Sequence, residues 1–356
     1  MRGRLLSLLG IFFILTLGHA RMPASRIECV AGCGERPLGG PALEARLIEP
    51  FGVAFDGNEN WYICEYKGHR ITRVTGSGVI SLFAGTEKPG YGGDGAAAAQ
   101  ASFNEPHGLV IGNGGQLYVA DTRNHRVRKV DLKTGAITTI AGTGKPGYSG
   151  DGGPAIGAQF DGVFGIDISK AGDRIYVADL GNKRVRVVSL KSGEVRTVAG
   201  NGQAGVPADG ADAAGSPLVD PRAVTVDSKG NLYILERGGD ALRIVDKQGK
   251  IRTLIGPAET DQPPMHPKLN GPKHLCVDLE DNVIVADSEN HLVRKFTPSS
   301  GKTVTIAGTG QKGARLAPED PLKTQLNRPH GVYVHPSGAL YVSDSDNNRI
   351  LKLTGW

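Results

Sequence analysis

Several features that would narrow the class of this 356-residue chain are scarce in it. Aromatic residues make up 6% of the sequence, which has four cysteines, three methionines and two tryptophans. Charges of the two signs nearly balance, with 41 Lys and Arg against 36 Asp and Glu, and they are interspersed along the chain. No basic block of the kind that binds nucleic acid stands out, so we expect no nucleic-acid partner.

The apolar run at residues 5–17 is too short for a membrane span, which needs about 20 apolar residues. Arg2 and Arg4 precede this run, and the small-residue pattern Gly18-His19-Ala20 follows it. This order is typical of a secretory signal peptide. We therefore predict a signal peptide over residues 1–20, a mature chain without a membrane anchor, and a secreted or periplasmic location. Removal of this segment lowers the formal charge of +5 by the two arginines.

Glycine and proline are abundant, at 52 and 21 residues, and they punctuate a repeated pattern. The clearest copy covers residues 101–157. It contains four short runs rich in β-branched, aliphatic and aromatic residues, each bounded by turn residues, as in consecutive antiparallel strands. We expect these strands at residues 107–111, 116–121, 125–131 and 136–141.

The start of this pattern recurs along the chain with a period of roughly 50–60 residues. The recurring starts lie at positions 50, 106, 163, 221, 272 and 329. Six copies with four strands each predict an all-β fold, a six-bladed β-propeller of four-stranded antiparallel blades. Because such a ring buries its core between neighbouring blades, we expect one domain over residues 21–356 rather than two.

The N-terminal segment indicates how the ring closes. Residues 27–32 match the fourth strand of the second blade at 137–142, while the sixth blade has three expected strands, the last at 349–353. We therefore predict that residues 27–31 pair beside 349–353 and complete blade six. This pairing would also cover a sheet edge that is otherwise prone to aggregation.

The run Tyr118–Arg126, with Ala-Asp-Thr-Arg-Asn-His-Arg at its end, resembles the hallmark of the NHL-repeat family. The linker Gly147–Ala155 resembles the long repeats of secreted bacterial members and of the teneurin propeller. The resemblance covers about residues 27–356 and implies the same propeller fold. It implies little about activity, because the family includes adhesion modules, RNA binders and at least one lyase.

The acidic residues that end most second strands have a structural interpretation. We expect them to accept backbone N–H groups across the tight turn that follows. They are Asp121, Asp179, Asp287 and Asp344. In the third strand of blade two, Arg126 and Arg128 alternate with Val127 and are interpreted as a solvated face.

The glycine-rich linkers carry one aspartate each, at Asp94, Asp151 and Asp209. A phosphate-binding loop is excluded because no Gly-Lys-Ser/Thr follows. One carboxylate per loop is also few for calcium, which takes several oxygen ligands. We expect these aspartates to cap the short Ala-rich turns that follow them.

The residue after each recurring start lies where the innermost strand of its blade begins. Six such residues should converge around one mouth of the central channel, a typical place for a ligand site. They are Phe51, His107, Phe164, Arg222, Lys273 and His330. The two cations beside two histidines favour an anionic ligand or an acidic peptide. Histidines that protonate near pH ~6.5 would tighten such binding at lower pH.

Two classes of function stay open. The first is an exported, monomeric and non-catalytic scaffold that binds a protein or a small anionic ligand. The second is an enzyme at the central channel, either a metal-assisted lyase or a lactonase-like hydrolase. The amidating lyase among NHL-type proteins holds zinc with three histidines, whereas this chain offers His107 and His330, with His274 shifted by one residue. Two ligands fall short of a catalytic zinc site, so we expect no metal, no cofactor and no catalytic residues.

The four cysteines and the irregular blade four give further expectations. A Cys29–Cys33 disulfide requires Gly32 or Gly34 to turn the chain, and the sequence leaves it open. Cys64 and Cys276 are expected to be free thiols on non-adjacent blades. Blade four lacks the Asn that stands in four of the other turns, and its proline-rich linker at 256–268 departs from the repeat, which makes that linker a second candidate for partner contacts.

Overall fold

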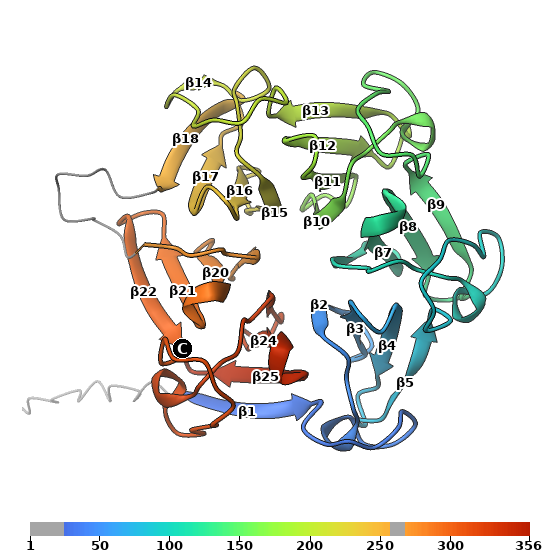
Figure 1. Cartoon of the computed structure of the whole chain (residues 1–356), viewed down its shortest axis with the longest axis vertical. Coiled ribbons are helices and arrows are strands. Elements are labelled where there is room, and N and C mark those ends of the chain that lie inside the picture. The colour runs from blue at the N-terminus through green and yellow to red at the C-terminus, as the bar shows by residue number, and fades with distance from the viewer. Residues whose placement is uncertain (1–24, 257–267) are drawn as a thin grey trace, which may run out of the picture.

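A computed structural model describes residues 25–256 and 268–356 (Figure 1). Six antiparallel sheets surround a central channel, and the helices described are three-residue 3₁₀ turns. The predicted six-bladed propeller is confirmed. In the part of the chain that the structure describes, no helix is long and apolar enough to cross a membrane. The predicted signal peptide and nearly all of the irregular linker of blade four lie outside the described residues.

In each blade the strands follow one another from the channel outward. Blades one to three contain β2 (Pro50–Phe55), β3 (Trp61–Glu65), β4 (Arg70–Val74), β5 (Ile80–Ala84); β6 (Leu109–Gly112), β7 (Gln116–Asp121), β8 (Arg126–Asp131), β9 (Ile137–Ala141); and β10 (Val163–Ile168), β11 (Arg174–Asp179), β12 (Arg184–Ser189), β13 (Val195–Ala199). The strands expected in blade two are therefore confirmed to within two residues.

Blades four to six repeat this arrangement, with one extra short strand in blade four. They contain β14 (Ala211–Asp212), β15 (Pro221–Val226), β16 (Leu232–Glu236), β17 (Ala241–Val245), β18 (Lys250–Ile255); β19 (His274–Val277), β20 (Val283–Asp287), β21 (Leu292–Thr297), β22 (Lys302–Ala307); and β23 (Gly331–Val334), β24 (Leu340–Asp344), β25 (Arg349–Thr354), β1 (Arg26–Ala31). Three 3₁₀ turns follow second strands, η3 (Thr122–Asn124), η5 (Ser288–Asn290) and η7 (Ser345–Asn347).

The ring closes through β1, as predicted. This strand pairs antiparallel with β25, with Ile27 opposite Leu353 and Cys29 opposite Leu351 (Figure 1). A disulfide joins Cys29 to Cys33, whose Cα atoms lie 6.6 Å apart, so the bridge that the sequence left open is formed. Cys64 is a buried free thiol and Cys276 a half-buried one, as expected.

The core lies between blades rather than inside them. Ile71 of blade one and Val119 of blade two belong to one apolar cluster, and the other clusters likewise join neighbouring blades. The innermost strands approach closely where four blades carry a glycine, at Gly52, Gly108, Gly165 and Gly331, whereas blades four and five carry Ala223 and His274 at the corresponding place. A Cβ atom at Gly165 would lie 2.6 Å from the Cα of Ala223 in the next blade.

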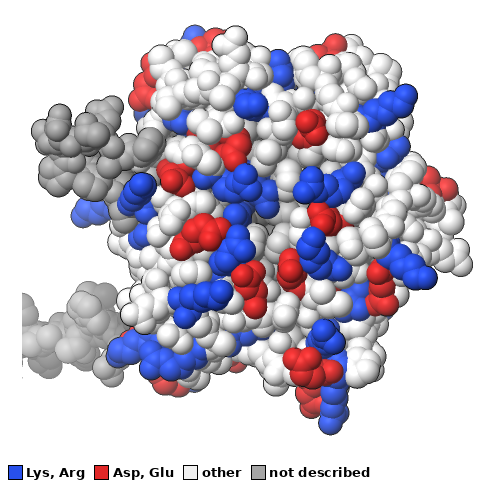
Figure 2. Space-filling view, viewed as in Figure 1, with Lys and Arg blue, Asp and Glu red and all other residues white. Residues whose placement is uncertain are grey.

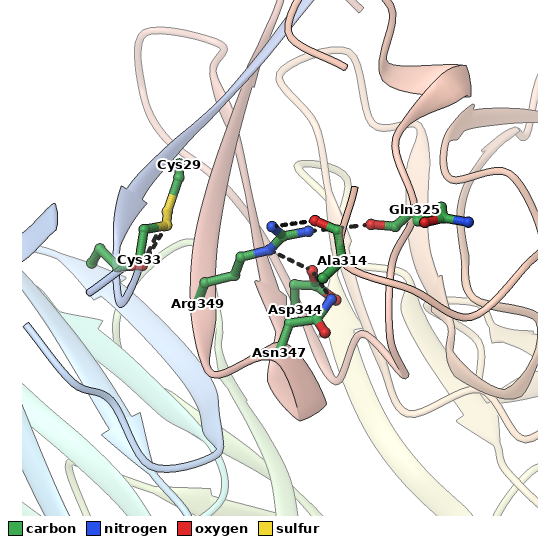
Figure 3. Close-up of a disulfide and its surroundings, with 8 residues drawn as sticks. Cys29, Cys33, Ala314, Gln325, Asp344, Asn347 and Arg349 are labelled. Atoms are coloured by element: carbon green, nitrogen blue, oxygen red, sulfur yellow. Dashed lines mark hydrogen bonds and ion pairs between the residues drawn. A yellow bond between two sulfur atoms is a disulfide. The ribbon is translucent and has the colours of Figure 1, made fainter. Parts of the chain in front are cut away.

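A buried acid–arginine pair stands inside each blade, between the end of the second strand and the third strand. The nitrogen–oxygen distances run from 2.5 to 3.8 Å. The pairs are Glu65–Arg70, Asp121–Arg128, Asp179–Arg186, Glu236–Arg243, Asp287–Arg294 and Asp344–Arg349. Figure 3 shows the pair of blade six, in which Arg349 also reaches the carbonyl oxygens of Ala314 and Gln325.

The acid of each pair does accept a backbone N–H, but from a different place than predicted. Asp121 accepts the N–H of Asn104, 2.9 Å away in the linker that precedes its blade, rather than an N–H across the tight turn. Both of its carboxylate oxygens also lie within 3.0 Å of the Asn124 amide nitrogen, which donates to the carbonyl oxygen of Gly90 as well. The carboxylate thus ties the incoming linker to the second strand, which is a structural role.

The interpretation of Arg126 and Arg128 as a solvated face is wrong for Arg128. This side chain is fully buried, and its guanidinium lies 3.2 Å from Asp121 and 2.8 Å from Asp94. The linker that carries Asp94 covers this face of the strand. Arg126 lies nearer the surface, with its guanidinium carbon 3.6 Å from the centroid of the Tyr91 ring.

The linker aspartates therefore do not cap the turns that follow them. The turn η2 (Ala98–Gln100) has Ala97 at its N-cap and no side-chain cap. Asp151 accepts from the Arg186 guanidinium at 2.6 Å and from the Thr197 backbone N–H. Asp209 accepts the N–H of Thr253 at 2.8 Å. These carboxylates hold the linker against the next blade.

A second set of hydrogen bonds joins neighbouring blades at the turn after each second strand. One residue of this turn is left-handed in all six blades, and in five of them its side chain accepts a backbone N–H from the segment that enters the next blade. The five bonds, each 2.7 to 3.1 Å long, are His69 to Glu105, His125 to Gly162, Asp240 to Gly271, His291 to Arg328 and Asn348 to Glu49. The sixth position is Lys183, whose ammonium cannot accept.

Candidate functional site

The six side chains predicted to converge do lie together at one end of the channel. We call this end the upper mouth; it opens on the face that carries the turns after the second strands. A cavity of about 720 Å³ occupies it and is lined by five of the six. They are Phe51, Phe164, Arg222, Lys273 and His330. His107 is buried against Phe51, Phe164 and Arg222.

Aromatic rings form part of the wall. Phe51 stacks on His330 with ring centroids 4.2 Å apart and on Tyr66 at 4.6 Å, and it meets His107 edge-on at 4.7 Å. The Phe51 ring therefore contacts both histidines with an apolar surface. Among the described residues, no group of three or more His, Cys, Asp or Glu is placed to hold a metal ion.

Arg222 is the central polar residue of the upper mouth. Its side chain is 6% exposed, and its guanidinium carbon lies 4.0 Å from the centroid of the Phe164 ring. Nη2 lies 2.7 Å from Nε2 of His107, and the buried Nε has no hydrogen-bond partner. No carboxylate of the described chain pairs with it. Burial, reinforced by the charge of Arg237, lowers the pKa of Arg222 to about 9, so the group is still a cation at neutral pH.

The two histidines are neutral, which corrects the prediction that they protonate near pH ~6.5. Burial, assisted by the charge of Arg222, lowers the pKa of His107 and of His330 well below the ordinary value. A neutral His107 accepts the Arg222 hydrogen bond through Nε2 and carries its own proton on Nδ1. The histidines therefore position the arginine and shape the wall, and they do not add positive charge.

Lys273 also lines the cavity and is 6% exposed. Its Nζ lies 3.3 Å from Glu289, and Arg328 binds the same carboxylate at 2.8 Å. Burial, with the charge of Arg222 next, lowers the pKa of Lys273. One carboxylate is thus shared by two cations.

The rim of the upper mouth carries further charged pairs. Arg123 pairs with Glu105 at 3.0 Å and Arg237 with Asp220 at 3.2 Å. Figure 2 shows Lys and Arg side chains gathered around the centre of the disc, with acidic residues between them. Most rim cations are therefore neutralised locally, whereas Arg222 is not.

Residues from the turns after the second strands also line this cavity, and the sequence reasoning missed them. Tyr66, Arg123 and Arg237 follow the acid that ends the second strand by one or two positions. The Tyr66 hydroxyl donates to Glu105 at 2.6 Å, which holds its ring against Phe51. The signal was available, because in an antiparallel meander the turn after the second strand lies at the same end of the blade as the start of the first strand.

His274, which the sequence places one residue out of step, lies away from the upper mouth. It is buried, lines a cavity at the opposite end of the channel, and accepts weakly from the Val332 N–H at 3.5 Å. Its shift by one residue thus places His274 on the other side of the strand from the upper-mouth residues, as the alternation of side chains along a strand requires.

Comparisons with known proteins agree with this architecture. The NHL repeat model matches residues 103–130, and the teneurin NHL domain model matches residues 192–355. The NHL repeat-containing protein 2 of Homo sapiens is 28% identical over 339 residues, which cover 85% of this chain and 46% of that protein. The chain therefore spans about half the length of this curated relative.

Solved structures share the fold at low sequence identity. An auxiliary nutrient binding protein from Bacteroides thetaiotaomicron is 13% identical with a TM-score of 0.65, over 93% of this chain and 76% of that one. Virginiamycin B lyase from Staphylococcus aureus is 15% identical with a TM-score of 0.54, over 93% of this chain and 99% of that one. The structure shows a six-bladed β-propeller, and the sequence of this chain is similar to an NHL repeat over residues 103–130 and to the teneurin NHL domain over residues 192–355.

Proposed function

We propose that this protein is an exported, non-catalytic binding propeller that recognises an anionic ligand at the upper mouth. The observation that supports this most is the state of Arg222. A buried guanidinium without a carboxylate partner is costly, because desolvation of the charge is not offset by an ion pair. A ligand carboxylate or phosphate in the 720 Å³ cavity would supply the missing partner.

The chemistry of the wall defines the ligand further. Arg222 offers a planar set of donors and Lys273 a point charge, and both reach the same cavity. Guanidinium groups bind carboxylate and phosphate oxygens through strong charge-assisted bonds. The rings of Phe51, Phe164 and Tyr66 add apolar surface beside these charges. A small organic anion, or an acidic side chain of a partner protein, therefore fits better than an uncharged ligand.

The alternative is an enzyme with its site at the same channel, which the structural likeness to virginiamycin B lyase suggests. The geometry favours binding over catalysis. Nε2 of His107, the natural proton acceptor, is already taken by Arg222. His330 donates its Nδ1–H to the carbonyl oxygen of Arg328 at 2.9 Å and stacks on Phe51, which leaves Nε2 as its acceptor. Burial keeps the pKa of His330 well below the ordinary value, so this nitrogen is a weak base.

The proposal is tested by calorimetry with succinate, glucuronate, inorganic phosphate and a tetraglutamate peptide. Arg222→Gln removes the charge and the far end of the guanidinium while it keeps a polar side chain at this position. We expect it to weaken the best ligand by about 1.5–3 kcal/mol, which is roughly 10- to 150-fold. The matched control is Arg237→Gln on the rim, which should have a smaller effect because Arg237 already pairs with Asp220.

Binding should also weaken as salt concentration rises, because the cavity is open to solvent and its charges are screened. An Arg222→Gln protein that binds every ligand of the wild type with unchanged affinity would show that the upper mouth is not the site. An uncharged analogue that binds as tightly as its anion would argue equally against it.

A further inference from the structure

The opposite end of the channel, which we call the lower mouth, contains a second cavity of about 340 Å³. The innermost strands of all six blades line it, and most of the residues they contribute are aliphatic or aromatic. Among them are Val53, Leu109, Ile166, Val224, Leu275 and Val334. The two ends of one channel thus differ, since the upper mouth is lined largely by charged and aromatic groups and the lower mouth mainly by apolar ones.

In each blade, the residue three positions after the upper-mouth residue lies on the innermost strand. The six residues there all line the lower cavity. They are Ala54, Val110, Asp167, Thr225, Cys276 and Tyr333. Asp167 is the one that carries a charge at neutral pH, because burial raises the pKa values of Cys276 and Tyr333 above their ordinary values.

The Asp167 carboxylate is held by neutral donors. Its Oδ2 accepts from the Thr225 hydroxyl and from the Val226 N–H, both at 2.9 Å, and its Oδ1 accepts from the Ile168 N–H at 2.8 Å. No Lys, Arg or His of the described chain forms an ion pair with it. Lys170 lines the edge of the same cavity but is exposed. Burial raises the pKa of Asp167 to about 6, so the carboxylate is mostly ionised at pH 7.5.

This arrangement is the converse of Arg222 at the upper mouth. A carboxylate is fixed in place by three hydrogen bonds, faces a cavity whose lining side chains are mainly aliphatic or aromatic, and lacks a cationic partner. Such a site is too poor in oxygen ligands for calcium or magnesium, which require several. An organic cation fits the site better, because its apolar part can fill the cavity while its charged group pairs with the carboxylate.

We propose that the lower mouth is a second ligand site, which binds a small organic cation consisting of a primary ammonium group on an apolar chain. The ammonium group pairs with Asp167, and the chain lies against the half-buried side chains of Val110, Val226 and Val334. This site does not depend on the anion site, because it uses other residues, the other end of the channel and the opposite sign of charge.

The test is calorimetry at pH 7.5 with three probes of equal chain length: hexylammonium, 1-hexanol and hexanoate. We expect hexylammonium to bind at least tenfold more tightly than hexanol, and hexanoate to bind least. In Asp167→Asn the side-chain oxygen can still accept from Thr225, but the charge is gone. We expect this variant to bind hexylammonium and hexanol equally.

Two further variants locate the binding. Arg222→Gln at the upper mouth should leave hexylammonium affinity unchanged, whatever it does to anion binding. Cys276→Phe narrows the lower cavity and should weaken hexylammonium and hexanol together. The proposal is overturned if wild-type protein binds hexylammonium no more tightly than hexanol, a comparison that holds even should Asp167→Asn fail to fold. It is overturned equally if Asp167→Asn retains the preference for the ammonium probe.

Discussion

The acid–arginine pairs inside the blades and the cations at the upper mouth use the same kinds of side chain in opposite electrostatic situations. Arg128 is fully buried between Asp121 and Asp94, and its charge is neutralised within the protein. Arg222 is almost as deeply buried, yet its nearest polar contact is the neutral imidazole of His107. Burial alone therefore does not distinguish a structural charge from one available to a ligand.

The difference lies in what each charge would leave behind if it were removed. Loss of Arg128 would leave two carboxylates without a cationic partner beside a buried strand, whereas loss of Arg222 would leave no carboxylate unpaired. Breaking a buried pair is strongly destabilising, while removing an unpaired buried charge relieves a desolvation penalty. The following variants test this contrast, beginning with the closure on which both sites depend.

Deletion of residues 21–34 should have the largest effect. It removes β1, so the β25 edge of blade six loses its partner and the ring stays open. We expect the deletion protein to unfold or aggregate, because an exposed strand edge pairs with other chains. Size-exclusion chromatography and thermal melting are the measurements. A monomer with an unchanged melting temperature would contradict the assignment of β1 as the closing strand.

Arg128→Met should lower the free energy of unfolding by roughly 3–5 kcal/mol, because it leaves Asp121 and Asp94 without their cation. The control is Arg126→Met on the same strand, where the guanidinium stacks on Tyr91 and donates to backbone oxygens, and roughly 1 kcal/mol is expected. Urea denaturation measures both. Equal losses for the two variants would show that the pairing with carboxylates is not the source of the effect.

The inter-blade hydrogen bonds predict a pH dependence, because His69, His125 and His291 accept through Nδ1 and must be neutral to do so. Burial lowers the pKa of each, against the opposing effects of Glu105, Asp161 and Glu289. A pKa lowered by folding means that the unfolded chain binds more protons. Their contribution is thus complete above the unfolded pKa of about 6.5 and is lost as pH falls below it.

The matched control for this pH dependence comes from blade six, where Asn348 makes the same bond to Glu49 at 2.8 Å without titrating. Replacement of all three histidines by Asn should keep the bonds and remove this part of the acid loss, roughly 0.5–1.5 kcal/mol for each bond. Asp121 and Asp179, whose pKa burial raises to about 6, act in the opposite direction in both proteins. The difference between the two urea titrations isolates the histidines. Parallel curves from pH 7.5 to 5 would contradict their role.

Arg222→Gln should have the smallest effect on stability, within about 1 kcal/mol of the wild type, even though Arg222 is buried. The same substitution carries the expected loss of anion affinity, so stability and binding should separate in this variant. A loss of stability as large as that of Arg128→Met would mean that Arg222 has a structural role like that of the paired arginines.

The repeat made most of the fold predictable. Runs of alternating residues placed the strands of blade two to within two residues, and the match of residues 27–31 to a fourth strand predicted the closure. Convergence of the six upper-mouth residues followed from their equivalent places in the blades. All of these inferences rest on local pattern and internal repetition, which a single sequence contains.

Contacts between a blade and its neighbour were not predictable in the same way. Alternation placed Arg126 and Arg128 on one face, but it does not reveal that the linker bearing Asp94 covers the position of Arg128. The pKa of His107 depends on Arg222, which is 115 residues away in the sequence. The sequence shows Asp167 only as a polar residue in a strand, and its place in the lower cavity becomes known from the structure alone.

The pairing of β1 with β25 has a consequence for the order of events during synthesis. Of the strands described here, β1 is synthesised first and its partner β25 last, so β1 cannot pair until nearly all of the described strands have been synthesised. Closure of so long a loop is entropically costly and slow relative to the stacking of neighbouring blades. The Cys29–Cys33 bridge spans four residues and can form early in an oxidising compartment. It would then hold the turn after β1 ready while the other blades assemble.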